Sequence, residues 1–181
     1  MTGVPLRAPI PQSYWVLPGT FLAGAYPGAE TGQITRQILQ RLIDAGIRQF
    51  FNLMELEELD LGGWPFPEYD TLLKDLGDKT GVDVGFERMP IRDMWVPTDG
   101  QMDRILDRID NALEEDKAAY VHCLGGRGRT GTVVGCFLAR HGYARSLKAL
   151  DRINDLRKNT ENRHRPSPET REQINMVLRW R

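Results

Sequence analysis

Residues 118–134 read AAYVHCLGGRGRTGTVV, and the interpretation of the whole chain starts from this stretch. Its first residues form a short apolar run of strand formers that stops at turn-forming glycines, which predicts a buried strand. From Thr130 onward, apolar residues recur at helical spacing. The sequence therefore predicts a glycine-rich loop between the end of a strand and the N-terminus of a helix.

A loop in this position is suited to bind a phosphate group. The first amide groups of a helix have no partner within it and lie at the positive end of its dipole, so they can surround an oxyanion. Glycines let the chain curl without side chains that would block those amides, and Arg129 adds a planar guanidinium that can bind two phosphate oxygens. The glycines are Gly125, Gly126, Gly128 and Gly131.

Cys123 would make this phosphate site reactive. A thiol beside a helix N-terminus and an arginine is expected to be held as the thiolate, which can attack a bound phosphorus and form a cysteinyl phosphate. The hydroxyl of Thr130 is expected to hydrogen-bond the sulfur as it leaves in the second step. We expect His122 to hold the loop through its ring nitrogens and not to exchange protons.

The string HCLGGRGRTG at residues 122–131 resembles the phosphate-binding loop of the cysteine-dependent protein tyrosine phosphatases, and the short chain resembles their compact dual-specificity branch. The resemblance implies that Cys123 is the nucleophile, that Thr130 assists the sulfur, and that the intervening residues bind the phosphoryl group. These binding residues are Leu124, Gly125, Gly126, Arg127, Gly128 and Arg129.

The general acid is expected on a loop that follows a predicted strand, thirty positions before Cys123. There Asp93 resembles the acid on the mobile loop of the same phosphatases, where it would protonate the leaving oxygen and then accept a proton from the attacking water. Arg92 precedes it where the tyrosine-specific members have Trp-Pro. Asp99 and Asp103 are alternatives, but Asp99 is better explained as a helix N-cap and Asp103 as a first-turn carboxylate.

Two further features bear on the site. An acidic run at residues 55–60 follows the strand predicted at residues 48–53. We expect a solvated loop there; the alternative is that its carboxylates repel wrong substrates or hold the phosphate-loop arginines. Gln173, near the end of the chain, is compared with a late glutamine that contacts the attacking water in some relatives.

Nucleotide-binding motifs overlap the same loop and are rejected. Gly126, Gly128 and Gly131 spell the G-x-G-x-x-G dinucleotide fingerprint, with Asp151 twenty residues further on. However, the segment after the predicted helix is helical again, so no second parallel strand closes the unit that this cofactor needs. Arg129 also stands where a Walker A loop requires lysine.

Composition and charge limit the classes of protein to which the chain can belong. The chain has 181 residues, 40% of them hydrophobic, and a net charge of −1, which predicts a single domain over residues 1–181 and no nucleic-acid partner. Prolines interrupt the first thirty residues, so we expect an irregular arm at residues 1–12 and neither a signal peptide nor a membrane span. Two cysteines suit a reducing cytoplasm. We expect no metal or other cofactor, because Cys136 and His141 do not share a helix face.

The remaining pattern predicts a three-layer α/β/α fold with a central, mostly parallel sheet of about four or five strands. Further strands are expected around the Pro18-Gly19 turn and at residues 48–53 and 82–91. Helices are expected at residues 31–45, 68–79, 99–113, 144–158 and 167–180. Ser167 is the predicted N-cap of the last helix.

The resemblance implies a phosphatase that acts on phosphotyrosine, and as a second class on phosphoserine and phosphothreonine, in a phosphorylated protein or peptide. A phosphoinositide or inositol phosphate phosphatase is the alternative enzyme, because relatives with those substrates carry extra positive charge in the loop. Arg127 supplies one such charge, and Leu124 does not supply a second. A phosphoprotein-binding module without turnover is the non-enzyme alternative.

Overall fold

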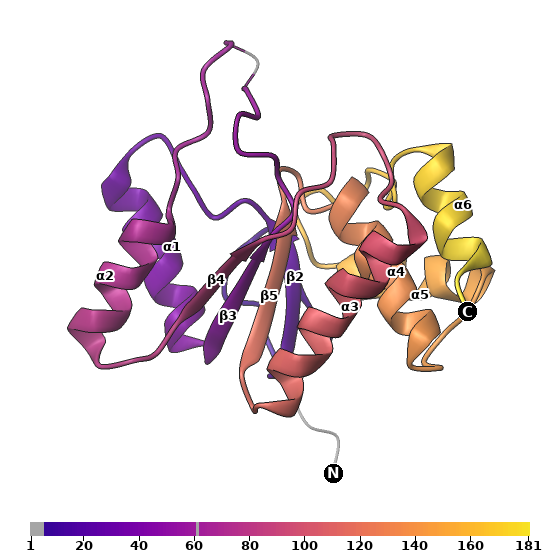
Figure 1. Cartoon of the computed structure of the whole chain (residues 1–181), viewed down its shortest axis with the longest axis horizontal. Coiled ribbons are helices and arrows are strands. Elements are labelled where there is room, and N and C mark those ends of the chain that lie inside the picture. The colour runs from indigo at the N-terminus through magenta and orange to yellow at the C-terminus, as the bar shows by residue number, and fades with distance from the viewer. Residues whose placement is uncertain (1–5, 61) are drawn as a thin grey trace.

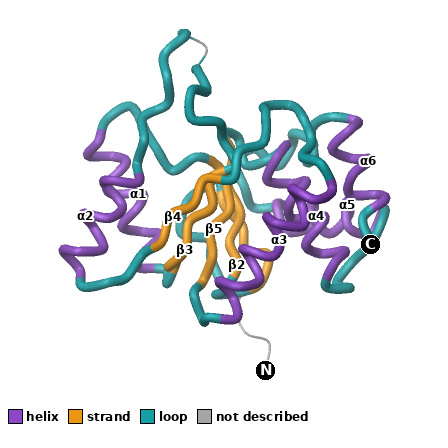
Figure 2. Tube along the Cα trace, viewed as in Figure 1, coloured by secondary structure: helices purple, strands orange, loops and turns teal. Residues whose placement is uncertain are grey.

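The computed structural model describes residues 6–60 and 62–181, and in this part of the chain one five-stranded sheet lies between two layers of helices (Figures 1 and 2). The strands, in their order across the sheet, are β1 (Ser13–Leu17), β2 (Phe21–Ala25), β5 (Ala118–Cys123), β3 (Ile47–Asn52) and β4 (Gly85–Arg88). Only β1 and β2 pair antiparallel. The predicted three-layer fold with a mostly parallel sheet is therefore confirmed.

Two helices cover one face of the sheet and four lie on the other side (Figure 1). The first pair is α1 (Gly32–Asp44) and α2 (Asp70–Thr80), and the others are α3 (Asp99–Glu114), α4 (Gly128–Arg140), α5 (Leu147–Arg157) and α6 (Arg171–Arg179). β5 contributes side chains to the hydrophobic cores on both sides of the sheet, because successive side chains of a strand point to opposite faces. Val121 and Cys123 pack into the core beneath α3 and α4, whereas Tyr120 packs toward α1 and α2.

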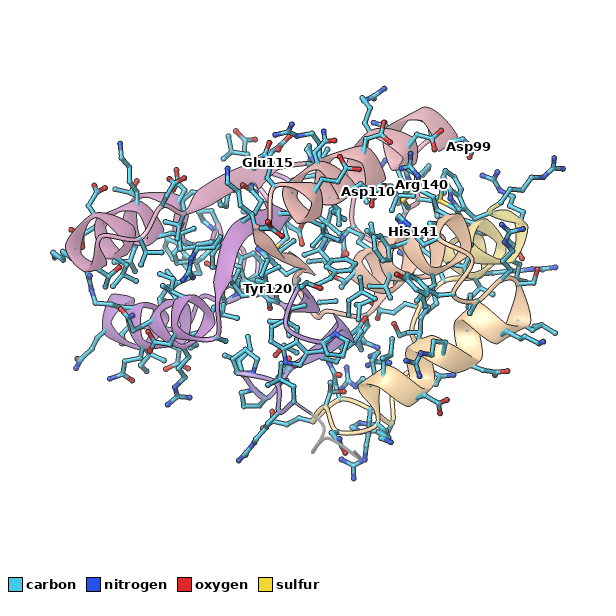
Figure 3. The ribbon with its side chains drawn as sticks, turned by 90° about the horizontal axis from the view of Figure 1, so that it is seen from below. Asp99, Asp110, Glu115, Tyr120, Arg140 and His141 are labelled. Carbon is cyan, nitrogen blue, oxygen red and sulfur yellow. The ribbon has the colours of Figure 1, made fainter. Side chains whose placement is uncertain are left out.

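Charged residues join α3 and α4 at the surface. Arg140 pairs with Asp107. The Nε atom of Arg140 lies 3.6 Å from Asp110, and the Nε2 atom of His141 lies 2.9 Å from the same Asp110; Figure 3 labels these three residues. Exposed ion pairs of this kind contribute about 0–1 kcal/mol each. The position of α4 is therefore set mainly by its buried apolar residues, which occupy most of the helix.

Two predicted helix N-caps are wrong. α3 is capped by Thr98, and Asp99 lies in its first turn; α6 is capped by Thr170 and not by Ser167. In both helices the threonine forms a capping box with a glutamine three residues later, which satisfies two backbone N–H groups reciprocally. The hydroxyl of Ser167 instead donates to the carbonyl of Arg127, 2.8 Å away.

The N-terminal arm is irregular at residues 6–12, as predicted, and residues 1–5 of that prediction lie outside the described residues. Ile10 of the arm is buried and packs against the core beneath α1 and α2. Within the described residues, no helix combines the length and the apolar character needed to cross a membrane.

The carboxyl ends of β5, β3 and β4 lie side by side because these three strands are adjacent and parallel. The loops that leave them gather beyond this edge of the sheet (Figure 2). They are residues 53–69 after β3, residues 89–98 after β4 and residues 124–127 after β5. The edge brings together segments that are far apart in the sequence, and ligands of open α/β sheets commonly bind there.

Candidate active site

Cys123 is the last residue of β5 and is almost buried, with 3% of its surface exposed. The chain then turns through residues 124–127 and enters α4 at Gly128. No acidic residue lies in the first turn of α4. The predicted arrangement of strand end, glycine loop and helix N-terminus is therefore present, and it places the thiol next to a helix terminus that favours negative charge.

Gly126 explains why the loop requires glycine. Its φ angle is +66°, and a Cβ atom there would lie 2.5 Å from the carbonyl carbon of Gly24 and 2.7 Å from the amide nitrogen of Ala25. Any side chain would therefore collide with the end of β2. The loop folds tightly against the neighbouring strand because this one position has no Cβ.

The carbonyl groups of the loop are held by partners outside it. The carbonyl oxygen of Leu124 accepts from the amide of Tyr26 at 3.1 Å, and that of Gly125 accepts from the side chain of Asn162 at 3.0 Å. In a trans peptide the next N–H group points opposite to the carbonyl. The amides of Gly125 and Gly126 are consequently turned toward the inside of the loop, which is the orientation an oxyanion requires.

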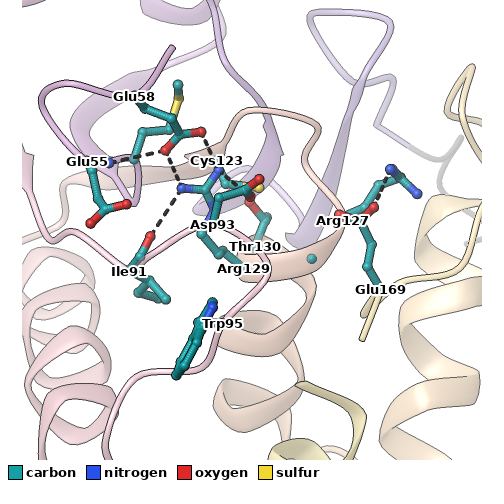
Figure 4. Close-up of polar contacts among 12 residues, drawn as sticks. Glu55, Glu58, Ile91, Asp93, Trp95, Cys123, Arg127, Arg129, Thr130 and Glu169 are labelled. Carbon is teal, nitrogen blue, oxygen red and sulfur yellow. Dashed lines mark hydrogen bonds and ion pairs between the residues drawn. The ribbon is translucent and has the colours of Figure 1, made fainter. Parts of the chain in front are cut away.

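Arg129 lies beneath the loop and is buried, and both of its terminal nitrogens have polar partners (Figure 4). Its two terminal nitrogens donate to the two carboxylate oxygens of Glu58 at 2.6 and 2.7 Å, and one of them also donates to the carbonyl of Ile91 at 3.1 Å. Burial alone would lower the pKa of Arg129, but the hydrogen bonds that it donates to Glu58 and the nearby charges of Cys123, Glu58 and Asp93 raise it.

The contact with Glu58 corrects the expectation of a solvated loop at residues 55–60. Glu58 is half-buried and holds Arg129 with a bidentate ion pair, whereas Glu55 and Glu57 are exposed. The alternative, that an acidic side chain of this run holds a phosphate-loop arginine, is the one that the geometry supports. The loop reaches Arg129 because β3, which it follows, is adjacent to β5 in the sheet.

Asp93 lies on the loop at residues 89–98, above Arg129. One of its carboxylate oxygens is 2.9 Å from a terminal nitrogen of Arg129, and 55% of the side-chain surface is exposed. The next residue, Met94, has a φ angle of +63°, which is a strained conformation for a side chain of this size. The guanidinium of Arg92 lies 4.8 Å from the centre of the Trp95 ring.

Gln173 of α6 is fully buried, and both ends of its amide are occupied. Its oxygen accepts from the backbone amides of Glu169 and Thr170, and its nitrogen donates to the carbonyl of Trp95 at 3.2 Å. Gln173 therefore joins the N-terminus of α6 to the loop that carries Asp93. In this structure it positions a loop, and the bond to Trp95 uses one of the two N–H groups of its amide.

His122 is buried between aromatic residues, and its contacts fix its tautomer. Nδ1 lies 3.3 Å from the carbonyl oxygen of Cys123, which can only accept, so Nδ1 carries the proton. Nε2 then accepts from the hydroxyl of Tyr69, 2.6 Å away. Burial lowers the pKa of His122 from 6.5 to about 3, so the ring is neutral at physiological pH.

Thr130 and Arg127 lie on either side of the start of α4. The hydroxyl of Thr130 is buried and donates to the carbonyl of Gly24 over a long 3.4 Å. The guanidinium of Arg127 forms an ion pair with Glu169, in which both side chains are largely buried (Figure 4). The positive charge of Arg127 is thus balanced by a carboxylate from the segment before α6.

The sequence-predicted site residues are brought together at one edge of the sheet, namely Cys123, the loop residues 124–128, Arg129, Thr130 and Asp93. Sequence reasoning missed the residues that hold this group from outside. Tyr69, Asn162 and Glu169 lie far from the loop in the sequence, and no local motif marks them. Ser167, the predicted N-cap of the last helix, also holds the loop, through its hydrogen bond to the carbonyl of Arg127.

This combination of fold and loop is that of the cysteine-dependent protein tyrosine phosphatase class. Residues 11–177 match the family described as Swiss Army Knife protein, DSP-PTPase phosphatase domain, so the chain belongs to this dual-specificity-type family. Among solved structures, the active form of Tk-PTP is similar with a TM-score of 0.63 and 24% sequence identity, over 92% of this chain and 94% of that one. That likeness concerns the fold.

Curated relatives match over shorter stretches. An uncharacterized protein of Methanocaldococcus jannaschii is 41% identical over 60 residues, which are 33% of this chain and 38% of that protein. Dual specificity protein phosphatase CDC14C of Homo sapiens is 38% identical over 65 residues, which are 35% of this chain and 14% of that protein. The matches thus span less than half of the length of these relatives.

Proposed function

We propose that this protein hydrolyses phosphate monoesters, with phosphotyrosine in a protein or peptide as its leading substrate, through a phosphocysteine intermediate. The observation that carries the proposal is the position of Cys123 at a strand end, facing a glycine loop whose amides point inward, with Arg129 beneath it. Phosphoserine and phosphothreonine are the second substrate class, since the chain belongs to the dual-specificity-type family. We place the reaction in a reducing cytoplasm, where a thiolate persists.

In the first step the thiolate of Cys123 attacks the phosphorus. An S–P bond forms and the P–O bond to the leaving group breaks, while Asp93 gives its proton to the departing oxygen. The loop amides at residues 124–128 and the guanidinium of Arg129 stabilise the charge on the equatorial oxygens. The product alcohol or phenol leaves, and the phosphoryl group stays on the sulfur.

In the second step a water molecule attacks the same phosphorus. Asp93, now a carboxylate, takes a proton from this water, and the S–P bond breaks to release inorganic phosphate and the thiolate. Thr130 assists by hydrogen-bonding the sulfur as it leaves. Its hydroxyl donates to the carbonyl of Gly24 in the unliganded site, so it must rotate to take this role.

The position of Asp93 calls for a movement of its loop during the cycle. Its carboxylate lies against Arg129, where it is 2.9 Å from a nitrogen that we assign to phosphate binding. A bound phosphoryl group would take this place. Asp93, released from the guanidinium, would take up a proton from solvent, and the loop would carry it to the leaving oxygen. During this movement, the hydrogen bond from Gln173 to the carbonyl of Trp95 keeps that part of the loop attached to α6.

The contact of Arg127 supports phosphotyrosine over the phosphoinositide alternative. A polyphosphate headgroup needs cationic groups beyond the one that binds the reacting phosphate. Arg127 is the candidate in the loop, but its charge is paired with Glu169. A singly phosphorylated side chain requires no such second cation, so the site suits a simple monoester better.

The deciding experiment uses the substitution Cys123→Ser in the full chain. We expect it to abolish turnover of a phosphotyrosyl peptide and of para-nitrophenyl phosphate, while the variant still binds the phosphopeptide in a fluorescence anisotropy assay. Cys136→Ser is the matched control, since Cys136 is buried in α4 and is given no role in the reaction. Full activity of Cys123→Ser would refute the mechanism, and binding without turnover in the unsubstituted protein would favour the non-enzyme alternative.

A further inference from the structure

A cavity of about 670 Å³ borders the phosphate loop at Leu124. Its walls come from the end of β2, the N-terminal arm, α1 and the loop at residues 53–69. Aromatic and aliphatic side chains dominate its lining, among them Tyr26, Ile38, Trp64, Phe66 and Leu124. The volume lies within the usual range for ligand pockets, and it is larger than a phosphate group requires.

Exposed hydrophobic side chains gather in the segments around the candidate active site. The described part of the chain has ten large hydrophobic residues with exposed surfaces, and six of them lie in the three loops that surround Cys123. These six are Leu56, Leu59, Trp64, Met94, Trp95 and Leu124. Apolar residues concentrated in one region of a surface mark a place where another molecule binds.

The wall that carries Trp64 is an ordered structure. Residues 55–60 and 62–67 project beyond the carboxyl edge of the sheet (Figure 1), and Leu59 and Pro65 pair across this projection as an antiparallel bridge. The carboxylate of Asp60 accepts from the backbone amide of Trp64 at 2.9 Å, and the ring of Phe66 packs on Tyr26 with centroids 5.5 Å apart. The cavity is therefore largely formed before any ligand arrives.

The charge of the side chains that line the cavity distinguishes between its possible ligands. The charged side chains that line the cavity are three acidic residues, Glu30, Asp60 and Glu161, and one basic residue, Arg41. The exposed Glu55 also lies in the projecting wall. An anionic lipid surface or an acidic peptide is repelled by this excess of negative charge, whereas a basic side chain is attracted.

We propose that the cavity binds a bulky apolar residue adjacent to the phosphorylated residue of a protein substrate, and that its acidic rim binds a basic residue next to it. This inference rests on the proposed function and names the substrate class of the same site. The phosphorylated side chain enters the loop above Cys123, and the neighbouring residue of the substrate passes over Leu124 into the cavity. Trp64 covers the apolar residue, and Glu30 and Glu161 face the basic one.

The test compares phosphotyrosyl peptides that carry Phe or Gly beside the phosphotyrosine, and Arg or Ser at the following position. We expect the Phe-Arg peptide to have the highest kcat/KM, and Trp64→Ala to reduce its kcat/KM about tenfold, as is typical when an aromatic contact is removed from a binding site. Para-nitrophenyl phosphate does not reach the cavity, so its kcat/KM is expected to stay unchanged. Leu147→Ala is the matched control, because Leu147 is equally exposed but lies on α5.

The acidic rim is tested with the double substitution Glu30→Gln and Glu161→Gln. We expect it to remove the preference for Arg over Ser and to leave the preference for Phe over Gly. Equal activity of all four peptides with the unsubstituted protein would overturn the proposal. So would an equal loss on peptide and on para-nitrophenyl phosphate in Trp64→Ala, or binding to anionic vesicles that depends on Trp64.

Failure of this inference is distinguishable from failure of the proposed function. Cys123→Ser binds peptides without turning them over, so the flanking preferences are also measured as affinities in that variant. Preferences in binding without turnover by the unsubstituted protein would refute the enzyme and keep the cavity. Turnover that depends on Cys123 with no flanking preference would keep the enzyme and refute the cavity.

Discussion

Removal of the Glu58 side chain tests how Arg129, the arginine proposed to bind phosphate, is held. Arg129 is 2% exposed, and both carboxylate oxygens of Glu58 accept from it at 2.6 and 2.7 Å. Glu58→Ala leaves a buried guanidinium with the carbonyl of Ile91 and the exposed carboxylate of Asp93 as its remaining partners. We expect this variant to be less stable, because the buried charge of Arg129 loses its main partner. We expect it to be less active, because the guanidinium of Arg129 is no longer held in one orientation.

The size of the effect follows from the burial of the pair. Removing one partner of a fully buried ion pair costs about 3–5 kcal/mol. Since the side chain of Glu58 is 10% exposed and Asp93 stays within 2.9 Å of Arg129, we expect a loss of about 2–3 kcal/mol in the free energy of unfolding. In a chain of this length each kcal/mol lowers Tm by about 2–4 °C, so Tm should fall by about 4–12 °C. We expect kcat to fall about 10²-fold, as a misplacement of about 1 Å would cause.

Urea denaturation and steady-state kinetics with para-nitrophenyl phosphate measure both effects. Glu57→Ala is the control, because Glu57 is exposed in the same loop. Glu58→Gln separates shape from charge: its amide oxygen restores one hydrogen bond, but its NH2 group faces a guanidinium N–H, so we expect an intermediate loss. The reasoning is refuted if the free energy of unfolding of Glu58→Ala lies within about 0.5 kcal/mol of that of the unsubstituted protein, because substitution of an ordinary surface residue has an effect of this size.

Three further substitutions test separate parts of the site. Burial lowers the pKa of His122 from 6.5 to about 3, so the unfolded chain binds a proton below pH 6.5 that the folded chain does not. The free energy of unfolding should therefore fall by about 2 kcal/mol from pH 7 to pH 5 on account of this residue, and urea titrations of His122→Gln should lack that part of the slope; equal slopes would contradict the buried neutral ring. Asp93→Asn should reduce kcat/KM, which reports the first step, about 10²- to 10⁴-fold for an alkyl phosphate and much less for para-nitrophenyl phosphate, whose leaving group needs no proton; equal losses of kcat/KM on both would remove Asp93 as the acid. Glu169→Gln releases the charge of Arg127, and we expect it to lower KM for a doubly phosphorylated substrate about three- to tenfold while KM for a singly phosphorylated one stays constant; no change for either would show that the pair does not select the substrate.

The sheet and the phosphate loop were predictable because their signals are local. The run that ends at Cys123, the glycines and the apolar spacing after Thr130 each depend on residues within a few positions, and these signals agree with one another. The two misplaced caps show the limit of this reasoning. At α3 and α6 a threonine with a glutamine three residues later competes with a nearby aspartate or serine, and the reciprocal capping box determines where the helix begins.

The residues that hold the loop were not predictable, because their roles depend on contacts across the fold. Asn162 reaches the carbonyl of Gly125 from 37 positions away, and the hydroxyl of Tyr69 reaches His122 from 53 positions away. A single asparagine or tyrosine has many uses, and neither lies in a recognisable motif. Unlike Asn162 and Tyr69, Glu58 lies in a segment that stands out in the sequence, the acidic run at residues 55–60. Its charge alone does not distinguish a solvated carboxylate from one that binds a buried arginine.

Under the proposed mechanism, the sharing of Arg129 between two carboxylates couples the binding of substrate to the position of Asp93, the proposed acid. The side chain of Glu58 is 10% exposed and binds Arg129 through both carboxylate oxygens, whereas that of Asp93 is 55% exposed and lies on a loop that contains a strained residue. Asp93 is therefore the partner that a phosphate dianion displaces more easily. Displacement ends the contact that keeps Asp93 away from the leaving oxygen. The anchor at Gln173 limits how far the loop can then move. In the proposed mechanism Asp93 therefore lies on the arginine as a carboxylate in the empty site. The arriving phosphate occupies the arginine and releases Asp93, which takes up a proton from solvent before it protonates the leaving oxygen.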